Sequence, residues 1–241
     1  MTCIEARYIP YHADKRIGRG KVLVLAPHPD DEVLGCAGAI MRHVADGDPV
    51  SVVILTDGAF GAGDRREDVT RVREEESLRA ARVMGYGVPE FWRLPDRGLE
   101  RHVPLVDDLS RVIDRLAPDW VYAPSWWEIH PDHFALARAV ASVFRRNSCA
   151  ARLVLFEVGV PLHVNRLLDI TDLLEKKRLA IDCFKSQLAH QAYDSQILAL
   201  NRFRTYTLPS TVEAAEAYRV IGPGKLPNDL SSPLMTDNSE A

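Results

Sequence analysis

The sequence lacks the cysteine spacing that metal ribbons and redox motifs require. Its four cysteines, Cys3, Cys36, Cys149 and Cys183, are scattered among 241 residues, and no CxxC pair occurs. A zinc ribbon and a thioredoxin-type motif are therefore not supported. Cys36 and Cys183 fall in predicted helices, where we expect them to be buried as small apolar side chains.

Long apolar runs and an excess of positive charge are also lacking. The N-terminal stretch MTCIEARYIPYHADKR has no apolar core of the kind found in a signal peptide, and no run is long enough to span a membrane. The formal net charge is -4, so the composition has no polycationic signature of nucleic-acid or anionic-membrane binding. We therefore expect a cytoplasmic protein with no membrane span and no nucleic-acid partner.

A glycine-rich phosphate loop is missing as well. The apolar run KVLVLA, residues 21–26, is followed by PHPDDE, where a dinucleotide-binding fold would place its glycines. The stretch GAFGAGDRR, residues 58–66, does not match GxGxxG and does not follow the first apolar run. A dehydrogenase is therefore poorly supported, and residues 58–66 are better interpreted as a mobile rim.

What the chain does contain is an alternation of short apolar runs and amphipathic stretches. Strands are predicted at 21–26, 49–56, 90–94, 119–123 and 152–158, and helices at 31–46, 68–84, 105–117 and 130–146. At these lengths the alternation predicts right-handed βαβ crossovers. We therefore expect a Rossmann-like three-layer α/β/α fold with a mostly parallel sheet, and a functional site at the carboxyl ends of its strands.

The last third of the chain has a different pattern. A further strand is predicted within 163–171, and helices are predicted at 172–191 and 197–204. From Gly222 onward the chain is rich in proline, glycine and serine, which is typical of a disordered tail. We therefore expect a single domain over residues 1–221 and a disordered tail over residues 222–241.

Two histidine-containing motifs follow the first and fourth predicted strands. They are HPDDE, residues 28–32, and HPDH, residues 130–133. Each motif alone is consistent with a polar helix cap, because aspartate caps helices and acids in the first turn suit the helix dipole. Together they bring imidazoles and carboxylates to one edge of the sheet, and a catalytic Zn²⁺ takes three such ligands. We therefore predict a metal site, although the residues alone do not tell which of Asp30 and Asp31 is a ligand and which takes a proton.

The two motifs resemble those of the LmbE-like (PIG-L) family of zinc-dependent N-acetylglucosamine deacetylases. The segments TDG, RVREEESLRAARVMG and KRLAIDCFKSQ fit the same family, so the resemblance covers residues 21–220. It implies that His28, Asp31 and His133 hold one Zn²⁺ per chain. It also implies that Asp30 is the general base, and that His130 stabilises the oxyanion and protonates the leaving amine.

The reaction that the resemblance implies is removal of the N-acetyl group from an N-acetylglucosamine-type conjugate. Zinc can lower the pKa of a bound water from about 15.7 to about 7. The tetrahedral oxyanion then needs a hydrogen-bond donor, and the leaving amine needs a general acid. We expect a small amino-sugar conjugate as the partner molecule. Similar proteins often form homo-oligomers, but the sequence fixes no number of subunits.

Four further residues have both a functional and a structural interpretation. Arg73 can bind a substrate hydroxyl, phosphate or carboxylate, or it can lie on a solvated charged helix. Asp96, after the third strand, can bind sugar hydroxyls or stabilise a turn. Trp126 and Trp127 can line a sugar pocket, although packing is their commoner role. Arg73 and Asp96 are therefore the predicted substrate-binding residues.

Two alternative functions are consistent with the same sequence. A zinc amidase acting on another acylated amine or on a thiol conjugate would keep this site, and only substrate profiling would separate it from a deacetylase. A non-catalytic sugar- or nucleotide-binding module has no use for an open three-ligand metal site. The zinc content of the purified protein distinguishes that module from both enzymes.

Overall fold

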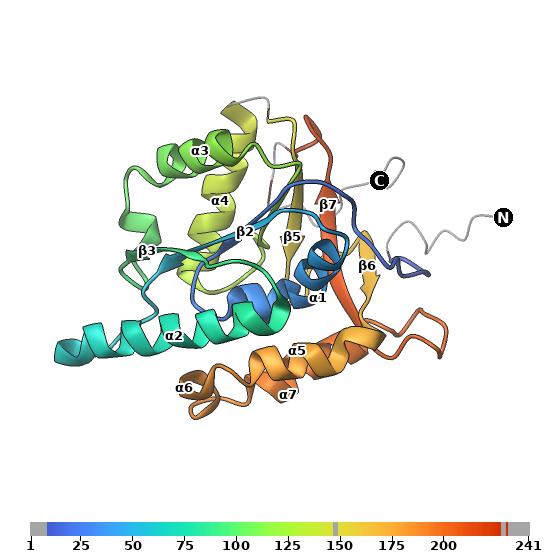
Figure 1. The fold of residues 1–241 in the computed structure, drawn as a ribbon. Coiled ribbons are helices and arrows are strands. Elements are labelled where there is room, and N and C mark those ends of the chain that lie inside the picture. The colour runs from blue at the N-terminus through green and yellow to red at the C-terminus, as the bar shows by residue number, and fades with distance from the viewer. Residues whose placement is uncertain (1–8, 147–148, 228–229, 231–241) are drawn as a thin grey trace.

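Seven strands form one sheet in the order β3-β2-β1-β4-β5-β7-β6 (Figure 1). The computed structural model describes residues 9–146, 149–227 and 230. The strands are β1 (Val22–Ala26), β2 (Val50–Thr56), β3 (Glu90–Leu94), β4 (Trp120–Pro124), β5 (Arg152–Phe156), β6 (Arg166–Asp169) and β7 (Ala215–Ile221). Strands β1 to β5 pair in parallel, whereas β7 is antiparallel to β5 and β6. The predicted mostly parallel sheet is therefore confirmed.

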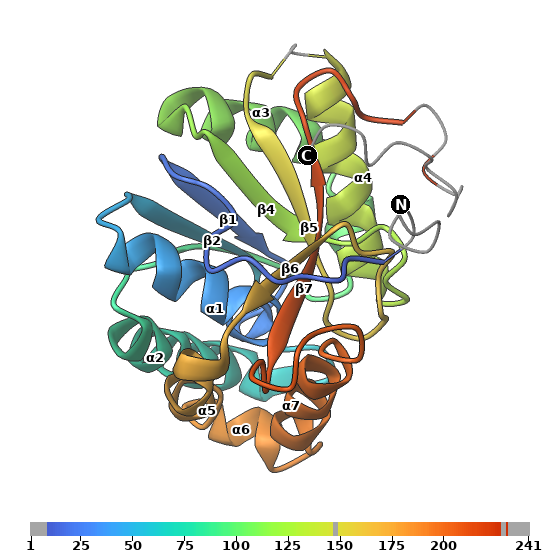
Figure 2. The same cartoon turned by 90° about the vertical axis from the view of Figure 1, so that its right-hand side faces the viewer.

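Helices cover both faces of the sheet, as Figures 1 and 2 show. One layer contains α1 (Asp31–Ala45), α2 (Arg66–Met84), α5 (Leu174–Ile181), α6 (Lys185–Leu188) and α7 (Tyr193–Phe203). The other layer contains α3 (Leu105–Leu116) and α4 (Pro131–Arg146). Short 3-10 turns lie at Gly63–Arg65, Leu99–Arg101 and Thr171–Leu173. The predicted three-layer arrangement is therefore confirmed.

Both faces of the central strands are buried, which explains their unbroken apolar sequences. In β1, Val22, Val24 and Ala26 pack in the core beside α1. Leu23 and Leu25 point the other way, into the core beside α3 and α4. Parallel strands that are covered on both faces have continuous hydrophobic sequences. This double burial is why short apolar runs predict these strands correctly.

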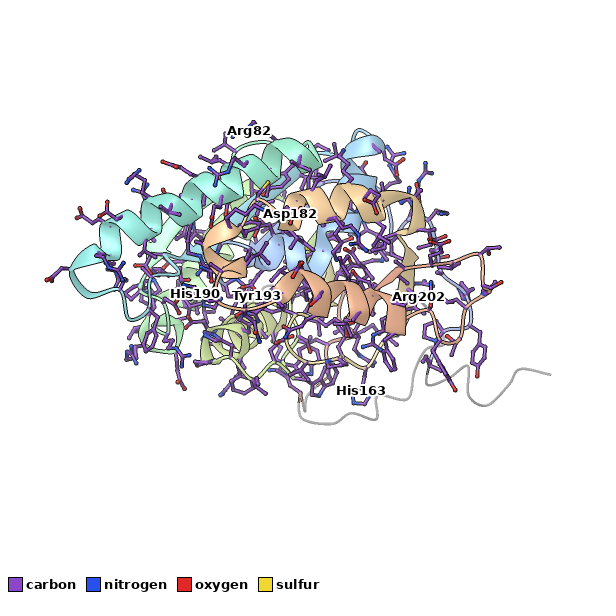
Figure 3. All side chains as sticks on the ribbon, turned by 90° about the horizontal axis from the view of Figure 1, so that it is seen from below. Arg82, His163, Asp182, His190, Tyr193 and Arg202 are labelled. Carbon is purple, nitrogen blue, oxygen red and sulfur yellow. The ribbon has the colours of Figure 1, made fainter. Side chains whose placement is uncertain are left out.

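The prediction of one continuous helix at 172–191 is wrong. The segment breaks between α5 and α6, and Figure 3 labels Asp182 at this break. Phe184 leaves helical geometry there and is buried in the core. Ser186 donates hydrogen bonds to Glu76 of α2 from its backbone N (2.8 Å) and its hydroxyl (2.6 Å). Contacts with α2 therefore outweigh the local helical pattern.

Strand β7 is absent from the elements predicted from the sequence. Its sequence AEAYRVI contains Glu216 and Arg219, which interrupt the apolar pattern of a buried strand. Both side chains are nevertheless buried in the structure. A strand that buries charged residues has no simple periodicity, so only its pairing with β5 and β6 reveals it.

The remaining predictions concern cysteines, boundaries and membrane spans. Cys36 is buried as predicted, whereas Cys183 lies in the break after α5 and is half-buried. Cys3 and most of the predicted tail fall outside the described residues. Strand β7 ends at Ile221, and the predicted domain limit at 221 stays a prediction. No helix in the described part of the chain is long and apolar enough to cross a membrane.

The carboxyl ends of β1 and β4 lie side by side and lead into helices on opposite faces of the sheet. Strand β1 continues into α1, and β4 continues into α4 in the other layer (Figure 2). The HPDDE and HPDH motifs occupy these two junctions. The topology therefore brings the two motifs together at the edge where parallel α/β sheets place their sites.

Candidate active site

The turn between β1 and α1 holds Asp30 in an unusual backbone conformation. Its φ angle is 136°, a positive value that residues other than glycine rarely adopt. The backbone N–H of Asp30 donates to Glu32 Oε2 at 3.1 Å. Its carbonyl accepts from the N–H groups of Val33 and Leu34, both at 2.9 Å. Strained residues of this kind cluster at functional sites, where the surroundings hold them in place.

Asp31 lies between two imidazoles that come from different motifs. One oxygen, Oδ2, is 3.0 Å from Nδ1 of His28 and 3.1 Å from Nε2 of His133. All three side chains are buried. Burial opposes ionisation of Asp31, but the charge and hydrogen bond of His133 and the hydrogen bond of His28 lower its pKa below the ordinary value. Asp31 is therefore ionised at neutral pH and faces two nitrogen donors.

The other side of the His28 ring faces two more carboxylates. Its Nε2 lies 3.1 Å from Asp132 Oδ2 and 3.4 Å from Asp96 Oδ1. The backbone N–H groups of Arg97 and Leu99 donate to the Asp132 carboxylate at 2.6 and 3.0 Å and fix its position. Burial opposes protonation of His28, but the hydrogen bonds with these carboxylates and with Asp31 raise its pKa well above the usual value.

His130 lies beside the other two histidines. The helix α4 begins at Pro131, so His130 precedes the helix instead of lying on its first turn, and its carbonyl accepts from the N–H of Phe134 at 3.0 Å. Its ring centroid is 4.6 Å from that of His28 and 5.3 Å from that of His133. Burial and the charges of those two rings lower the pKa of His130 to about 4.

Two groups of side chains place metal-donor atoms close together. In each group the donor atoms lie within 4.8 Å of one another, and the groups are His28, His130 and His133, and His28, Asp96 and Asp132. The predicted ligand set is arranged differently, because one oxygen of Asp31 contacts the imidazoles of both His28 and His133. Imidazole and carboxylate donors are suited to Zn²⁺. These residues therefore fit a metal, and which three of them bind it stays a prediction.

Arg73 reaches across from α2 and contacts Asp30. Its Nη2 donates to Asp30 Oδ2 at 2.9 Å and to the Pro29 carbonyl at 2.6 Å, while Nη1 donates to the Gly58 carbonyl at 2.9 Å. Burial raises the pKa of Asp30 and the charge of Arg73 partly offsets this, so the pKa is about 7. A carboxyl group with a pKa near neutrality can both take up and return a proton.

Comparison with known proteins agrees with this arrangement. A family model described as PIG-L, GlcNAc-PI de-N-acetylase, matches residues 23–144, which include both histidine motifs. The chain belongs to the PIG-L family. The resemblance inferred from the motifs is therefore confirmed.

Relatives of this PIG-L chain include proteins named as deacetylases. The probable N-acetyl-α-D-glucosaminyl L-malate deacetylase 2 of Bacillus anthracis is 30% identical over 190 residues, which cover 70% of this chain and 81% of that protein. The N,N'-diacetylchitobiose deacetylase of Pyrococcus horikoshii has the same fold, with a TM-score of 0.76, 23% identity and 91% of each chain covered. The fold of this chain is therefore also that of a solved N,N'-diacetylchitobiose deacetylase.

The relatives are not all deacetylases. The 4-oxalmesaconate hydratase of Pseudomonas putida is 27% identical over 189 residues, which cover 68% of this chain and 73% of that protein. A hydratase adds water across a double bond instead of cleaving an amide. Membership in the PIG-L family therefore does not by itself determine which bond reacts.

The structure brings the five predicted catalytic and metal residues of this PIG-L chain together, as the contacts above show. The two predicted substrate-binding residues lie close by. Arg73 is buried, so its interpretation as part of a solvated helix is wrong. Burial opposes ionisation of Asp96, but its contact with His28 lowers its pKa to about 2. Whether Arg73 and Asp96 contact substrate stays a prediction.

The two tryptophans differ in their surroundings. Trp126 is buried in the core beside α3 and α4, which agrees with a packing role. Trp127 is half-buried, and its ring lies 5.3 Å from that of Trp126 and 5.0 Å from that of His163. Trp127 therefore packs against Trp126 and against the loop that contains His163.

Three acidic residues at the site are missing from the sequence prediction. Glu32 and Asp132 lie inside the two histidine motifs. Their positions therefore mark them as site residues, although neither is among the assigned metal ligands. Glu128 lies two residues before His130 and is also buried. Burial raises the pKa of Glu128, while His133 and three backbone N–H groups act in the opposite direction. A lone glutamate in a loop carries no sequence pattern that marks it as buried.

Proposed function

We propose that this protein is a zinc-dependent deacetylase that removes the N-acetyl group from an N-acetylglucosamine-type conjugate. One observation carries the proposal. Asp31 lies between two imidazole nitrogens, at 3.0 and 3.1 Å, and the adjacent Asp30 faces an arginine instead. Two neighbouring acids with such different partners are suited to two different tasks, metal binding and proton transfer.

His28, Asp31 and His133 would hold the metal. When bound there, zinc would supply a Lewis acid for the amide carbonyl and lower the pKa of water. The donor set supports this assignment, because a catalytic zinc uses three nitrogen or oxygen ligands and leaves one position open.

Asp30 and His130 would carry the protons. Asp30 accepts the proton of the attacking water, and Arg73 holds the Asp30 carboxylate in position through the 2.9 Å contact. His130 donates a hydrogen bond to the oxyanion and assists proton transfer to the leaving amine. Its lowered pKa means that the ring is uncharged at neutral pH in these surroundings. Asp30, once it carries the proton from water, is then a second donor for the amine.

A hydratase is the second candidate, because one relative is named as such. The addition of water to an unsaturated acid also needs a base and an electrophile; Asp30 can serve as the base, and a metal held beside it would supply the electrophile. The two reactions differ in their products, since only deacetylation releases acetate and a free amine.

The decisive experiment is product analysis with the zinc-loaded protein. We expect release of acetate and of a free amine from N-acetyl-α-D-glucosaminyl L-malate or diacetylchitobiose, and loss of that release when a chelator removes the metal. Hydration of an unsaturated dicarboxylic acid without acetate release from any N-acetyl conjugate would favour the hydratase. A protein that holds no zinc and turns over neither class would support a binding module.

A further inference from the structure

Glu128 is a buried acid that the proposed reaction does not use. It lies in the loop between β4 and α4, and it is 5% exposed. The loop after β5 surrounds its carboxylate with backbone donors. Oε1 accepts from the N–H groups of Val158 (2.7 Å), Gly159 (3.1 Å) and Val160 (3.3 Å), and Oε2 also accepts from Gly159 at 3.1 Å. These N–H donors favour the ionised carboxylate and partly offset burial, which raises the pKa of Glu128.

The free side of this carboxylate faces His133. Glu128 Oε2 is 3.7 Å from Nδ1 of His133. That nitrogen is buried and has no hydrogen-bond partner among the described residues. The distance is an ion-pair contact and is too long for a hydrogen bond. A small movement of either side chain would close it.

His28 shows the same arrangement with the gap already closed. Its Nδ1 faces Asp31 at 3.0 Å, and its Nε2 faces the Asp132 carboxylate at 3.1 Å. His133 presents Nε2 to Asp31 and Nδ1 to Glu128. The side chains therefore form a row with Asp31 at its centre. His28 lies between Asp31 and Asp132, and His133 lies between Asp31 and Glu128.

We propose that Glu128 is the positioning residue of His133: its carboxylate accepts a hydrogen bond from Nδ1–H, which leaves the Nε2 lone pair free to face the metal site. The inference rests on the proposed function only through the metal site. Histidines that bind metals commonly donate their second ring N–H to a carboxylate, which fixes the tautomer and the ring orientation. Glu128 does not touch the reacting atoms, so its contribution acts through His133.

The loop after β5, whose N–H groups donate to Glu128, is itself fixed by buried contacts. A side chain at Gly159 would place its Cβ 3.1 Å from Glu128 Oε2, so the close approach of the backbone depends on glycine. Glu157 forms a bidentate buried ion pair with Arg204, at the end of α7. Arg204 also donates to the Leu162 carbonyl at 2.9 Å, and the Leu162 N–H donates to Glu157 at 2.8 Å. The C-terminal part of the fold thus supports His133 through this loop.

The first test measures zinc affinity in Glu128→Gln. Glutamine keeps the size of the side chain and can accept from the loop amides through its carbonyl oxygen, but it then presents an N–H donor to His133 Nδ1. We expect competition with a fluorescent chelator to show zinc binding that is about 10- to 100-fold weaker than in the wild type. The matched control is Glu175→Gln, at a glutamate whose side chain is 87% exposed. The inference is wrong if a folded Glu128→Gln protein binds zinc as tightly as the control.

The second test reads the tautomer directly in the wild-type protein. We expect ¹⁵N NMR of zinc-loaded, histidine-labelled protein to show a proton on His133 Nδ1 in slow exchange with water. In Glu128→Gln this proton should exchange faster or be lost. A proton on Nε2 of His133 in the zinc-loaded wild type would overturn the inference, even if the variant did not fold. Failure of the wild type to bind zinc would instead refute the proposed function.

Discussion

At the scale of single residues, the contrast between Asp30 and Asp31 determines the chemistry that the site can perform. The positive φ of Asp30 turns its side chain toward Arg73, while Asp31 starts the helix and faces the two imidazoles. Burial acts on both acids, yet their pKa values shift in opposite directions, because their charged neighbours differ. Two identical side chains thus acquire different properties from their positions in one turn.

The first prediction concerns the metal ligands. His28→Ala, Asp31→Ala and His133→Ala should each lose most of the bound zinc, because each removes one of the three assigned protein ligands. Elemental analysis after dialysis measures the zinc per chain, which we expect to be about one in the wild type. His190→Ala, at an exposed histidine labelled in Figure 3, is the control. Full retention of zinc in all three ligand variants would disprove the assignment.

The second prediction concerns Asp30. Asp30→Asn should retain zinc, because Asp30 is not assigned as a ligand, and it should lose roughly 10²-fold or more in kcat, the scale expected for a missing general base. Steady-state kinetics and zinc analysis on the same preparation check both parts. Asp68→Asn, at an aspartate whose side chain is 75% exposed, should leave both unchanged. Near wild-type turnover by Asp30→Asn would mean that another group is the base.

The third prediction concerns His130, which belongs to one of the two groups of close metal donors. If it acts on the oxyanion and not on the metal, His130→Ala should lower kcat much more than it raises KM, because the interaction strengthens in the transition state. The zinc content should stay at the wild-type value. Loss of zinc in this variant would identify His130 as a ligand in place of one of the assigned three.

At the scale of elements, a buried ion pair supports the kink in α1. Cys36 has non-helical backbone angles inside this helix. Gly38 N donates to Glu216 Oε1 at 2.8 Å, and the Leu34 carbonyl accepts from Lys177 Nζ at 3.1 Å. In an unbroken helix these two groups, four residues apart, would pair with each other. The Lys177–Glu216 pair, itself 2.8 Å apart, therefore supplies the partners that the kink removes.

The fourth prediction tests this ion pair. Glu216→Gln leaves the fully buried Lys177 ammonium without its counter-charge. We expect the free energy of unfolding to fall by about 3–5 kcal/mol, as is usual when one partner of a buried pair is removed. Denaturant unfolding measures the change, and the double variant Glu216→Gln/Lys177→Met should lose less. A loss below about 1 kcal/mol, the size expected for exposed pairs, would show that the pair does not support the kink.

At the scale of the whole molecule, ion pairs join the segment before β1 to the body of the fold. Lys15 lies 2.8 Å from Asp169 at the end of β6, and Arg19 lies 2.9 Å from Asp48 after α1. Arg42 of α1 pairs with Asp172 at 2.5 Å. These pairs connect segments that are far apart in the sequence, so their state affects the cooperativity of the whole chain.

The fifth prediction is a loss of stability at acidic pH. The hydrogen bond with Arg42 lowers the pKa of Asp172. Burial acts to raise the pKa of Asp169, but the contact with Lys15 contributes to a net lowering of that pKa. Because the folded-state pKa values lie below the unfolded value of about 3.9, the unfolded chain binds more protons as the pH falls. The stabilisation is complete above about pH 5, begins to fall below it, and disappears only when the pH drops below the folded-state pKa values, so pH 3 shows part of the loss. Thermal unfolding from pH 7 to pH 3 should show Tm falling less steeply in Asp172→Asn than in the wild type. An equally steep fall of Tm in Asp172→Asn and in the wild type would show that the Asp172 carboxylate does not cause the acid-induced loss of stability.

The sequence alone determined the elements whose signals are local. Apolar runs buried on both faces predicted β1, β2 and β4, and the spacing of the two motifs after their strands predicted that His28 and His133 would meet. Parallel βαβ topology makes this inference possible, because it brings strand ends to one edge whatever lies between them. The family followed from the same few residues.

Only the tertiary structure decided the contacts between distant segments. It showed that Glu128 lies behind His133, that Lys177 and Glu216 pair inside the core, and that the helix predicted at 172–191 breaks where it meets α2. Local patterns report which face of an element is apolar, but they do not specify which buried charge meets which. That choice depends on packing among elements separated by many residues, and it is why the supports of the site, unlike its motifs, were visible only in the folded chain.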